Sequence, residues 1–264
     1  MFKFGGLFSN GVDYLQKHGD SLIRKVEKKT YNSAHADDPH GVIKAYLVRL
    51  QNNVEAMVVL LKDGYGNPAI ILQRSLIEDY LNLSYILKHP NISRGYLIKQ
   101  FYEYLTNVQR HKHMERYEKM GTRIEEPLRS EIINNFQKFK NDYNDGKGVK
   151  RWSCMSLESQ AKELSNSLND DTYIKIYYTM YNLFSEEYHS LSRTFLEHVN
   201  TSLTLKSASG RADYRTEETM INIIIKYGEL IQEIAKFYGI SNREFKNVAE
   251  KLLKKLRKQF DIHG

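Results

Sequence analysis

VIKAYLVRLQNNVEAMVVLLK, residues 42–62, is the segment that decides the fold class. Apolar residues recur along it at helical spacing, namely Ile43, Leu47, Leu50, Val54, Met57, Val58 and Leu61. This pattern predicts an amphipathic helix with one face in a core. The sequence DGYGNP at 63–68 ends that helix, because glycine permits a left-handed turn and Pro68 suits the first turn of the next helix.

Helical spacing of apolar residues extends over most of the chain. It predicts further helices at 11–29, 68–88, 92–120, 125–143, 156–167, 171–205, 215–238 and 242–260. The chain has only 4 prolines, which favours long uninterrupted helices, and no segment has a convincing strand pattern. We therefore expect an all-α protein, built as an antiparallel multi-helix bundle. Its expected parts are an N-terminal helix and loop (1–39), a helical core domain (40–210) and a C-terminal helical hairpin packed on the core (211–264).

Composition narrows the class of protein. Hydrophobic residues make up 41% of the chain and charged residues 27%, as in globular proteins. Cys154 is the only cysteine, which excludes an intramolecular disulfide framework and a multi-thiolate zinc site and is typical of a cytosolic protein. No apolar run approaches the roughly 20 residues of a membrane span, and residues 1–8 are too short for the apolar part of a signal peptide. We expect a cytoplasmic protein with no membrane span, metal or other cofactor.

The net charge of +7 favours a polyanionic partner such as RNA, DNA or anionic lipid. A solvated, lysine-rich surface would give the same charge. Of the polyanions, RNA is the partner that we expect.

Arg74 and Glu78 lie on the apolar face of the helix predicted at 68–88. Positions 70, 74, 77, 78, 81 and 85 share this face. An arginine four residues before a glutamate can form an ion pair, but such a pair is costly on an apolar face unless its polar groups are satisfied. The pair either clamps neighbouring helices or belongs to a functional cleft, and in both cases it can orient a histidine from another helix.

FSEEYHSLSRTFLEH, residues 184–198, places two histidines and an arginine in one predicted helix. Ser185, His189 and Arg193 are spaced by four residues and share a face. His198 falls nearer the core stripe if the helix is regular, so Arg193 and His198 converge only if the helix is broken or a second subunit supplies one of them. The core stripe itself consists of Phe184, Tyr188, Leu191 and Phe195.

Histidine and arginine together are suited to RNA cleavage. A histidine can deprotonate a ribose 2′-hydroxyl or protonate the leaving 5′-oxygen, while an arginine holds the phosphate and stabilises the developing charge. Such a site needs no metal. The candidate catalytic residues are therefore His189, Arg193, His198, Arg74 and Glu78.

Four further residues are candidates for substrate binding. Ser185 and Tyr188 flank the histidines in sequence. Arg110 and Lys112 belong to the basic run RHKHMER at 110–116, which forms either a solvated face or a contact with the RNA backbone.

Three sequence elements resemble an uncharacterised bacterial all-helical domain family. They are Arg74-x-x-x-Glu78 on an apolar helix, Trp152 after a loop, and Tyr181-x-x-x-Ser185-x-x-x-His189. The resemblance extends over residues 40–210. It implies an all-helical fold and no established activity.

The motif Arg193-x-x-x-x-His198 resembles the hallmark of the HEPN superfamily (higher eukaryotes and prokaryotes nucleotide-binding). Members are small helical bundles, often dimeric, and many are metal-independent ribonucleases of toxin–antitoxin, abortive-infection and other phage-defence systems. The resemblance implies that Arg193 and His198 are the catalytic pair, with Glu78 as a supporting acid, in a homodimer with an antitoxin or defence-system partner. Thr194 departs from the pattern, because HEPN ribonucleases often carry a residue such as asparagine there, and the chain is longer than a minimal HEPN domain.

Two functions are compatible with these residues. The first is a metal-independent, HEPN-like endoribonuclease that acts as a bacterial toxin or phage-defence effector and cleaves RNA through attack by the ribose 2′-hydroxyl. The alternative is a non-enzymatic helical module that binds a nucleotide, a small ligand or a protein partner through a cleft formed by Arg74, Glu78 and His189.

Overall fold

The computed structural model describes residues 6–30, 39–63, 65–182 and 213–241, together with residues 243, 247, 250, 251 and 254. All regular structure in these segments is helical, which confirms the all-α expectation. The segments 183–205 and most of 242–260, both predicted helical, lie outside the described residues. The helices are α1 (Gly6–Thr30), α2 (Pro39–Lys62), α3 (Gly66–Lys88), α4 (Arg94–Glu103), α5 (Gln109–Lys119), α6 (Leu128–Asn144), α7 (Leu157–Leu168), α8 (Thr172–Ile176) and α11 (Asp213–Phe237), with the π-helical turns η1 (Tyr104–Val108) and η2 (Tyr177–Tyr181).

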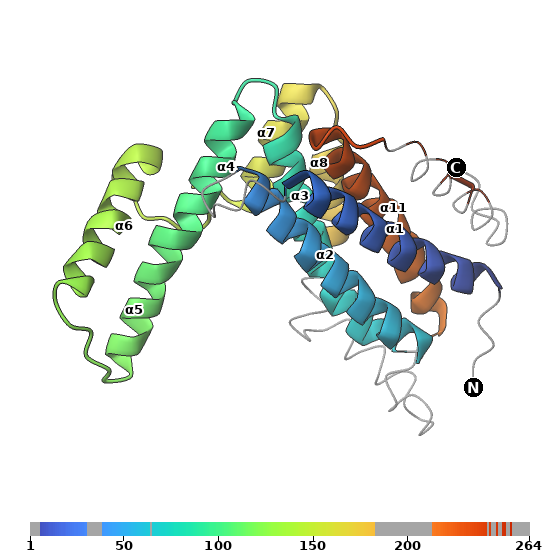
Figure 1. Ribbon diagram of the computed structural model, residues 1–264, viewed down its shortest axis with the longest axis horizontal. Helices are drawn as coiled ribbons and strands as arrows, with labels where there is room; N and C mark the ends of the chain where they lie inside the picture. The colour runs from blue at the N-terminus through green and yellow to red at the C-terminus, as the bar shows by residue number, and fades with distance from the viewer. Residues whose placement is uncertain are drawn as a thin grey trace.

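Helix α3 lies at the centre of the bundle (Figure 1) and packs against α2, α11 and α7. Every residue from Tyr80 to Leu87 is buried, which explains why this segment is so apolar in sequence. Burying one large aliphatic side chain contributes roughly 1.5–3 kcal/mol. The burial of α3 therefore contributes substantially to stability, and its packing positions the side chains that α3 carries.

Gly19 allows α1 to approach α2 and α11 closely. A Cβ atom at this position would collide with the side-chain amide of Gln51 and the hydroxyl of Tyr227. The Tyr227 hydroxyl donates a hydrogen bond to Gln51 Oε1, and Gln51 Nε2 donates to Glu55 Oε1 at 2.8 Å. This polar network therefore connects α2 and α11 inside the core, directly beneath α1.

The helices α4, η1, α5 and α6 form a hairpin arm that projects from the bundle (Figure 1). The helix predicted at 92–120 is continuous over α4, η1 and α5, but it contains the π-helical turn η1. Within that turn the Thr106 hydroxyl donates to the carbonyl oxygen of Tyr102 at 3.1 Å. The Tyr104 hydroxyl donates to the carbonyl oxygen of Lys150 at 3.2 Å. The base of the arm is therefore tied to the segment between α6 and α7.

His89 stabilises the turn between α3 and α4. Its Nδ1 atom accepts hydrogen bonds from the backbone N–H groups of Asn91 (3.3 Å) and Ile92 (3.1 Å). Because Nδ1 accepts, the proton of the neutral ring is assigned to Nε2, which lies 3.3 Å from Glu163 Oε1. Ser93 then caps α4 by accepting from the backbone N–H of Tyr96 at 3.2 Å. These bonds set the direction in which the arm leaves the bundle.

The terminal parts of the described chain pack on the central helices, since α1 contacts α2 and α11 contacts α1, α2 and α3. The domain boundaries drawn from the sequence, at 39/40 and 210/211, stay predictions, as do the antiparallel and HEPN-like arrangements of the bundle. Among the described helices, none is both long enough and apolar enough to span a membrane.

Candidate functional site

One side of α3 carries a line of polar residues, and it includes Glu78, which the sequence pattern assigns to the apolar face. Ser75, Glu78, Asp79 and Asn82 follow one another at spacings that place them on the same face of the helix. Each has a polar partner from another part of the fold, either from α2 or from the segment between α6 and α7. This polar face is therefore the place where distant parts of the chain meet through charged groups.

Two arginines approach the carboxylate of Glu78. Arg151 Nη2 donates to Glu78 Oε1 at 2.6 Å, and Arg74 Nη1 lies 4.0 Å from Glu78 Oε2. The side chains of Arg74, Arg151 and Glu78 are 28%, 25% and 24% exposed. The Arg74–Glu78 pair expected from the sequence is present, but Arg151 supplies the closer partner.

Tyr181 brings the end of η2 to Arg74. Arg74 Nη2 donates to the Tyr181 hydroxyl at 2.6 Å, and the guanidinium carbon lies 4.7 Å from the centre of the tyrosine ring. Tyr177 stacks on Tyr181, with ring centres 5.4 Å apart and planes inclined by 20°. We call the group formed by Arg74, Glu78, Arg151 and Tyr181 the motif junction. In this group the Arg74-x-x-x-Glu78 motif meets Tyr181, the first residue of the Tyr181-x-x-x-Ser185-x-x-x-His189 motif.

Trp152 fixes the segment that carries Arg151. Its indole N–H donates to Asn82 Oδ1 at 2.9 Å, and Gln160 Nε2 donates to the same oxygen at 3.2 Å. The indole is buried and meets the ring of Phe101 edge-on. The tryptophan singled out by the family resemblance is therefore an anchor, and its neighbour Arg151 is the residue that enters the motif junction.

Asp79 is a buried carboxylate beside the motif junction. Its side chain is 1% exposed, and Arg49 Nη2 lies 3.1 Å from Oδ1. Within the described part of the chain neither carboxylate oxygen accepts a hydrogen bond. Burial raises the pKa of Asp79 to about 7, although Arg49 lowers it, and the negative charge of Glu78 adds to the rise. Carboxylates perturbed in this way gather at functional sites, which supports this side of α3 as the candidate site.

Most of the residues predicted around the histidines lie outside the described part of the chain, namely Ser185, Tyr188, His189, Arg193 and His198. Their positions relative to the motif junction stay predictions. In sequence, the junction residue Tyr181 is the first residue of Tyr181-x-x-x-Ser185-x-x-x-His189.

The two basic residues predicted to contact RNA lie on α5, in the hairpin arm and away from α3 (Figure 1). Arg110 Nη1 lies 3.0 Å from Glu131 Oε1 of α6. Lys112 Nζ donates to the Tyr104 hydroxyl at 3.2 Å and to the carbonyl oxygen of Lys150 at 3.3 Å. Both side chains hold the arm together, and their contact with RNA stays a prediction.

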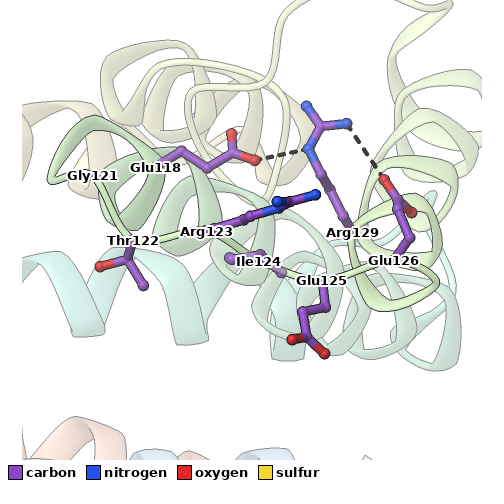
Figure 2. Close-up of a pocket in the computed structure, with 8 residues that line it drawn as sticks. All are labelled: Glu118, Gly121, Thr122, Arg123, Ile124, Glu125, Glu126 and Arg129. Atoms are coloured by element: carbon purple, nitrogen blue, oxygen red, sulfur yellow. Dashed lines mark hydrogen bonds and ion pairs between the residues drawn. The ribbon is translucent and has the colours of Figure 1, made fainter.

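A polar hollow lies at the tip of the arm, where α5 turns into α6. Arg129 lies between the carboxylates of Glu118 and Glu126 (Figure 2). Its Nε atom is 2.8 Å from Glu118 Oε1, and its Nη1 atom is 3.8 Å from Glu126 Oε1. Arg123 extends across the same hollow (Figure 2). None of the described residues predicted for the site lines this hollow. Across the described residues, no three histidine, cysteine, aspartate or glutamate side chains gather as a metal-ion site.

Sequence reasoning missed Arg49, Asp79 and Arg151. The sequence does contain a feature that points to Asp79, because a second acidic residue directly after Glu78 is unusual in so apolar a helix. Arg151 also has a signal, since it adjoins Trp152. No feature of the sequence points to Arg49, because an arginine in an amphipathic helix normally faces solvent.

Residues 40–205 match the model of a family of unknown function, DUF5677. No curated protein and no solved structure matches the chain. The matched region includes the whole motif junction and extends beyond Tyr181 through the two histidines. Since this region is more than half of the chain, the protein belongs to the family of unknown function DUF5677.

Proposed function

We propose that the protein is a metal-independent endoribonuclease and that the motif junction binds the phosphate at which RNA is cut. The observation that carries the proposal is the hydrogen bond between Arg74 and Tyr181. It joins α3 to Tyr181, the residue from which the chain continues toward His189. Arginine, carboxylate and tyrosine side chains therefore stand at the start of the segment that supplies the candidate base.

The charges at the motif junction suit a phosphate. The motif junction contains two guanidinium groups and one carboxylate, and about a quarter of each of these side chains is exposed. Arginine presents N–H groups in a planar fork that matches phosphate oxygens. Because both oxygens of Glu78 face cations, its role in this proposal is to orient the two guanidinium groups.

The proposed reaction is a transesterification within RNA. His189 or His198 removes the proton of a ribose 2′-hydroxyl, whose oxygen forms a new bond to phosphorus while the bond from phosphorus to the 5′-oxygen breaks. A separate acidic group protonates the departing 5′-oxygen. Arg74 and Arg193 stabilise the negative charge that grows on the phosphate oxygens. The products are a 2′,3′-cyclic phosphate and a free 5′-hydroxyl.

The biological part of the proposal follows from the HEPN resemblance. It assigns the protein the role of a bacterial toxin or phage-defence effector, acting as a homodimer that an antitoxin or another defence protein controls. The net charge of +7 suits an RNA substrate.

Incubation of purified protein with total RNA in EDTA tests the activity. We expect cleavage by the wild type, and loss of cleavage in whichever of His189→Ala and His198→Ala removes the base or the acid. Arg24→Gln, which removes an exposed guanidinium of α1, is the control and should cleave at the wild-type rate. Equal cleavage by all four proteins would identify a contaminating nuclease and refute the proposal.

The described side chains also support a second candidate, a module that binds a nucleotide or another phosphate ligand without cleaving it. The two guanidinium groups offer binding contacts, while Glu78 is engaged by cations and Asp79 is buried. A nucleotide that raises the melting temperature in wild type but not in Arg74→Ala, with no cleavage in either, would favour this candidate.

A further inference from the structure

A groove lies between α2 and the base of the hairpin arm. Its volume is about 370 Å³, which is near the lower end of the range for small-molecule sites. Carbon atoms form most of its walls, supplied by Val42 and Ala45 of α2 and by Phe101 and Leu105 of the arm. Among the described residues that line it, Arg49 alone carries a charge. We call this hollow the α2–α4 groove.

Arg49 is fixed at one nitrogen and open at the others. Its Nη2 atom lies 3.1 Å from Asp79 Oδ1 and donates to the Ser75 hydroxyl at 3.4 Å. Across the described parts of the chain, Nε and Nη1 make neither a hydrogen bond nor an ion pair. The side chain is 55% exposed. A buried carboxylate therefore holds the guanidinium in place while the remaining N–H groups stay accessible.

This arrangement resembles a receptor for a small amphipathic anion. A pre-positioned guanidinium binds a carboxylate, sulfonate or phosphate without first losing the freedom of its own side chain. The apolar walls gain from covering a carbon skeleton, and Leu105 is 46% exposed when the groove is open. A protein partner would need roughly 800 Å² of surface on this side, much more than a groove of this size provides.

We propose that the α2–α4 groove binds a small organic anion whose apolar body lies against Val42, Phe101 and Leu105 and whose charged group pairs with Arg49. The site is separate from the proposed RNA site, because none of its lining residues belongs to the motif junction. The two sites are nevertheless connected through α3. Asp79 of α3 holds Arg49 of the groove, and it directly follows Glu78 of the motif junction.

Anilinonaphthalene sulfonate is a suitable probe, because it combines an apolar body with one anionic group and fluoresces when shielded from water. We expect saturable binding of one dye per chain. Ala45→Trp should abolish it by filling the groove, while Ala56→Trp, which changes another exposed alanine of α2, should leave it unchanged. Arg49→Gln should weaken binding by at least about tenfold, as expected for loss of a charge-assisted hydrogen bond, and the surface control Arg24→Gln should not.

Competition separates the role of the charge from that of the apolar walls. Octanoate should displace the dye from wild type at least about ten times more effectively than octanol, and this difference should disappear in Arg49→Gln. Circular dichroism and melting curves confirm that each variant is folded, since partly folded proteins also bind this dye.

Three results would overturn the proposal: no dye binding by folded wild type, equal binding by all variants, or equal displacement by octanoate and octanol. A dimer in sedimentation that Ala45→Trp dissociates would also overturn it, and would assign the groove to a second copy of the chain. None of these measurements depends on RNA cleavage, so failure here and failure of the proposed ribonuclease are distinguishable.

Discussion

Replacement of Asp79 by asparagine should change how the stability of the protein depends on pH. Burial raises the pKa of Asp79 from 3.8 to about 7, against the lowering effect of Arg49 and with an additional rise from Glu78. Each unit of pKa corresponds to 1.36 kcal/mol, so the shift represents a cost of about 4 kcal/mol at pH values above both pKa values. Asparagine stays neutral and removes this cost.

The sign of the effect follows from proton binding. Below about pH 4 the carboxyl is protonated in both the folded and the unfolded chain, so Asp79 contributes no pH dependence. Between about pH 4 and pH 7 the unfolded chain releases the proton while the folded chain keeps it. The free energy of unfolding therefore falls as pH rises through this window, by up to about 1.4 kcal/mol per pH unit. Above about pH 7 both states are ionised and the loss is complete.

Urea unfolding followed by circular dichroism, at pH values from about 4 to about 8, measures this contribution. The quantity to compare is the difference in free energy of unfolding between Asp79→Asn and wild type, because other titrating groups cancel in it. We expect the difference to increase by about 4 kcal/mol in favour of the variant across the range. The unpaired amide of the asparagine adds a constant that does not depend on pH.

Two further variants control the interpretation. Asp63→Asn changes an exposed carboxylate after α2 and is the surface control measured in the same series. Arg49→Gln removes the cation that lowers the pKa of Asp79, so the stability loss should continue to higher pH. A flat difference for Asp79→Asn would refute the reasoning, because it would mean that this carboxyl ionises equally in the folded and unfolded chain.

Other substitutions test the packing that positions the site. Gly19→Ala should lower the free energy of unfolding by about 1–3 kcal/mol through the clash between helices, whereas Gly95→Ala, where a Cβ meets open space, should be neutral or slightly stabilising; both are measured by urea unfolding. Gln73→Met should stabilise the protein by about 1 kcal/mol in the same assay, because both polar atoms of the buried Gln73 side chain lack a partner within the described structure; no gain over wild type would contradict this. Trp152→Phe should lower both stability, by about 1 kcal/mol, and RNA cleavage, because it releases the segment that carries Arg151; unchanged cleavage would show that the position of Arg151 is irrelevant to activity.

The helices of this fold can be predicted from the sequence, because burial of one helix face requires apolar residues at a regular spacing. Residues 42–62 and 68–88 predict α2 and α3 to within a few residues of their observed bounds, Pro39–Lys62 and Gly66–Lys88. The π-helical turn η1 is not readable in this way. It lies inside a segment whose apolar pattern is uniformly helical, and its hydrogen bonds to Lys112 and Lys150 form only in the folded chain.

The candidate site is only partly readable, for a related reason. Arg74 and Glu78 are visible as a pair because local helix geometry brings them together. Arg151 and Tyr181 reach them from far along the chain, 73 residues after Glu78 and 107 residues after Arg74. No local pattern encodes such a meeting, so the composition of the motif junction depends on tertiary packing. Asp79 illustrates the same limit, because its raised pKa comes from burial that a single sequence does not reveal.

The most direct test of the central claim is the rate at which Arg74→Gln cleaves RNA in EDTA, compared with Arg24→Gln and wild type. If the motif junction binds the phosphate that is cut, loss of one guanidinium should slow cleavage by about 10²–10³-fold. Arg24→Gln should keep the wild-type rate and leave 2′,3′-cyclic phosphate ends. Cleavage by folded Arg74→Gln at the wild-type rate, or the absence of cleavage by every form at high enzyme concentration, would contradict the account.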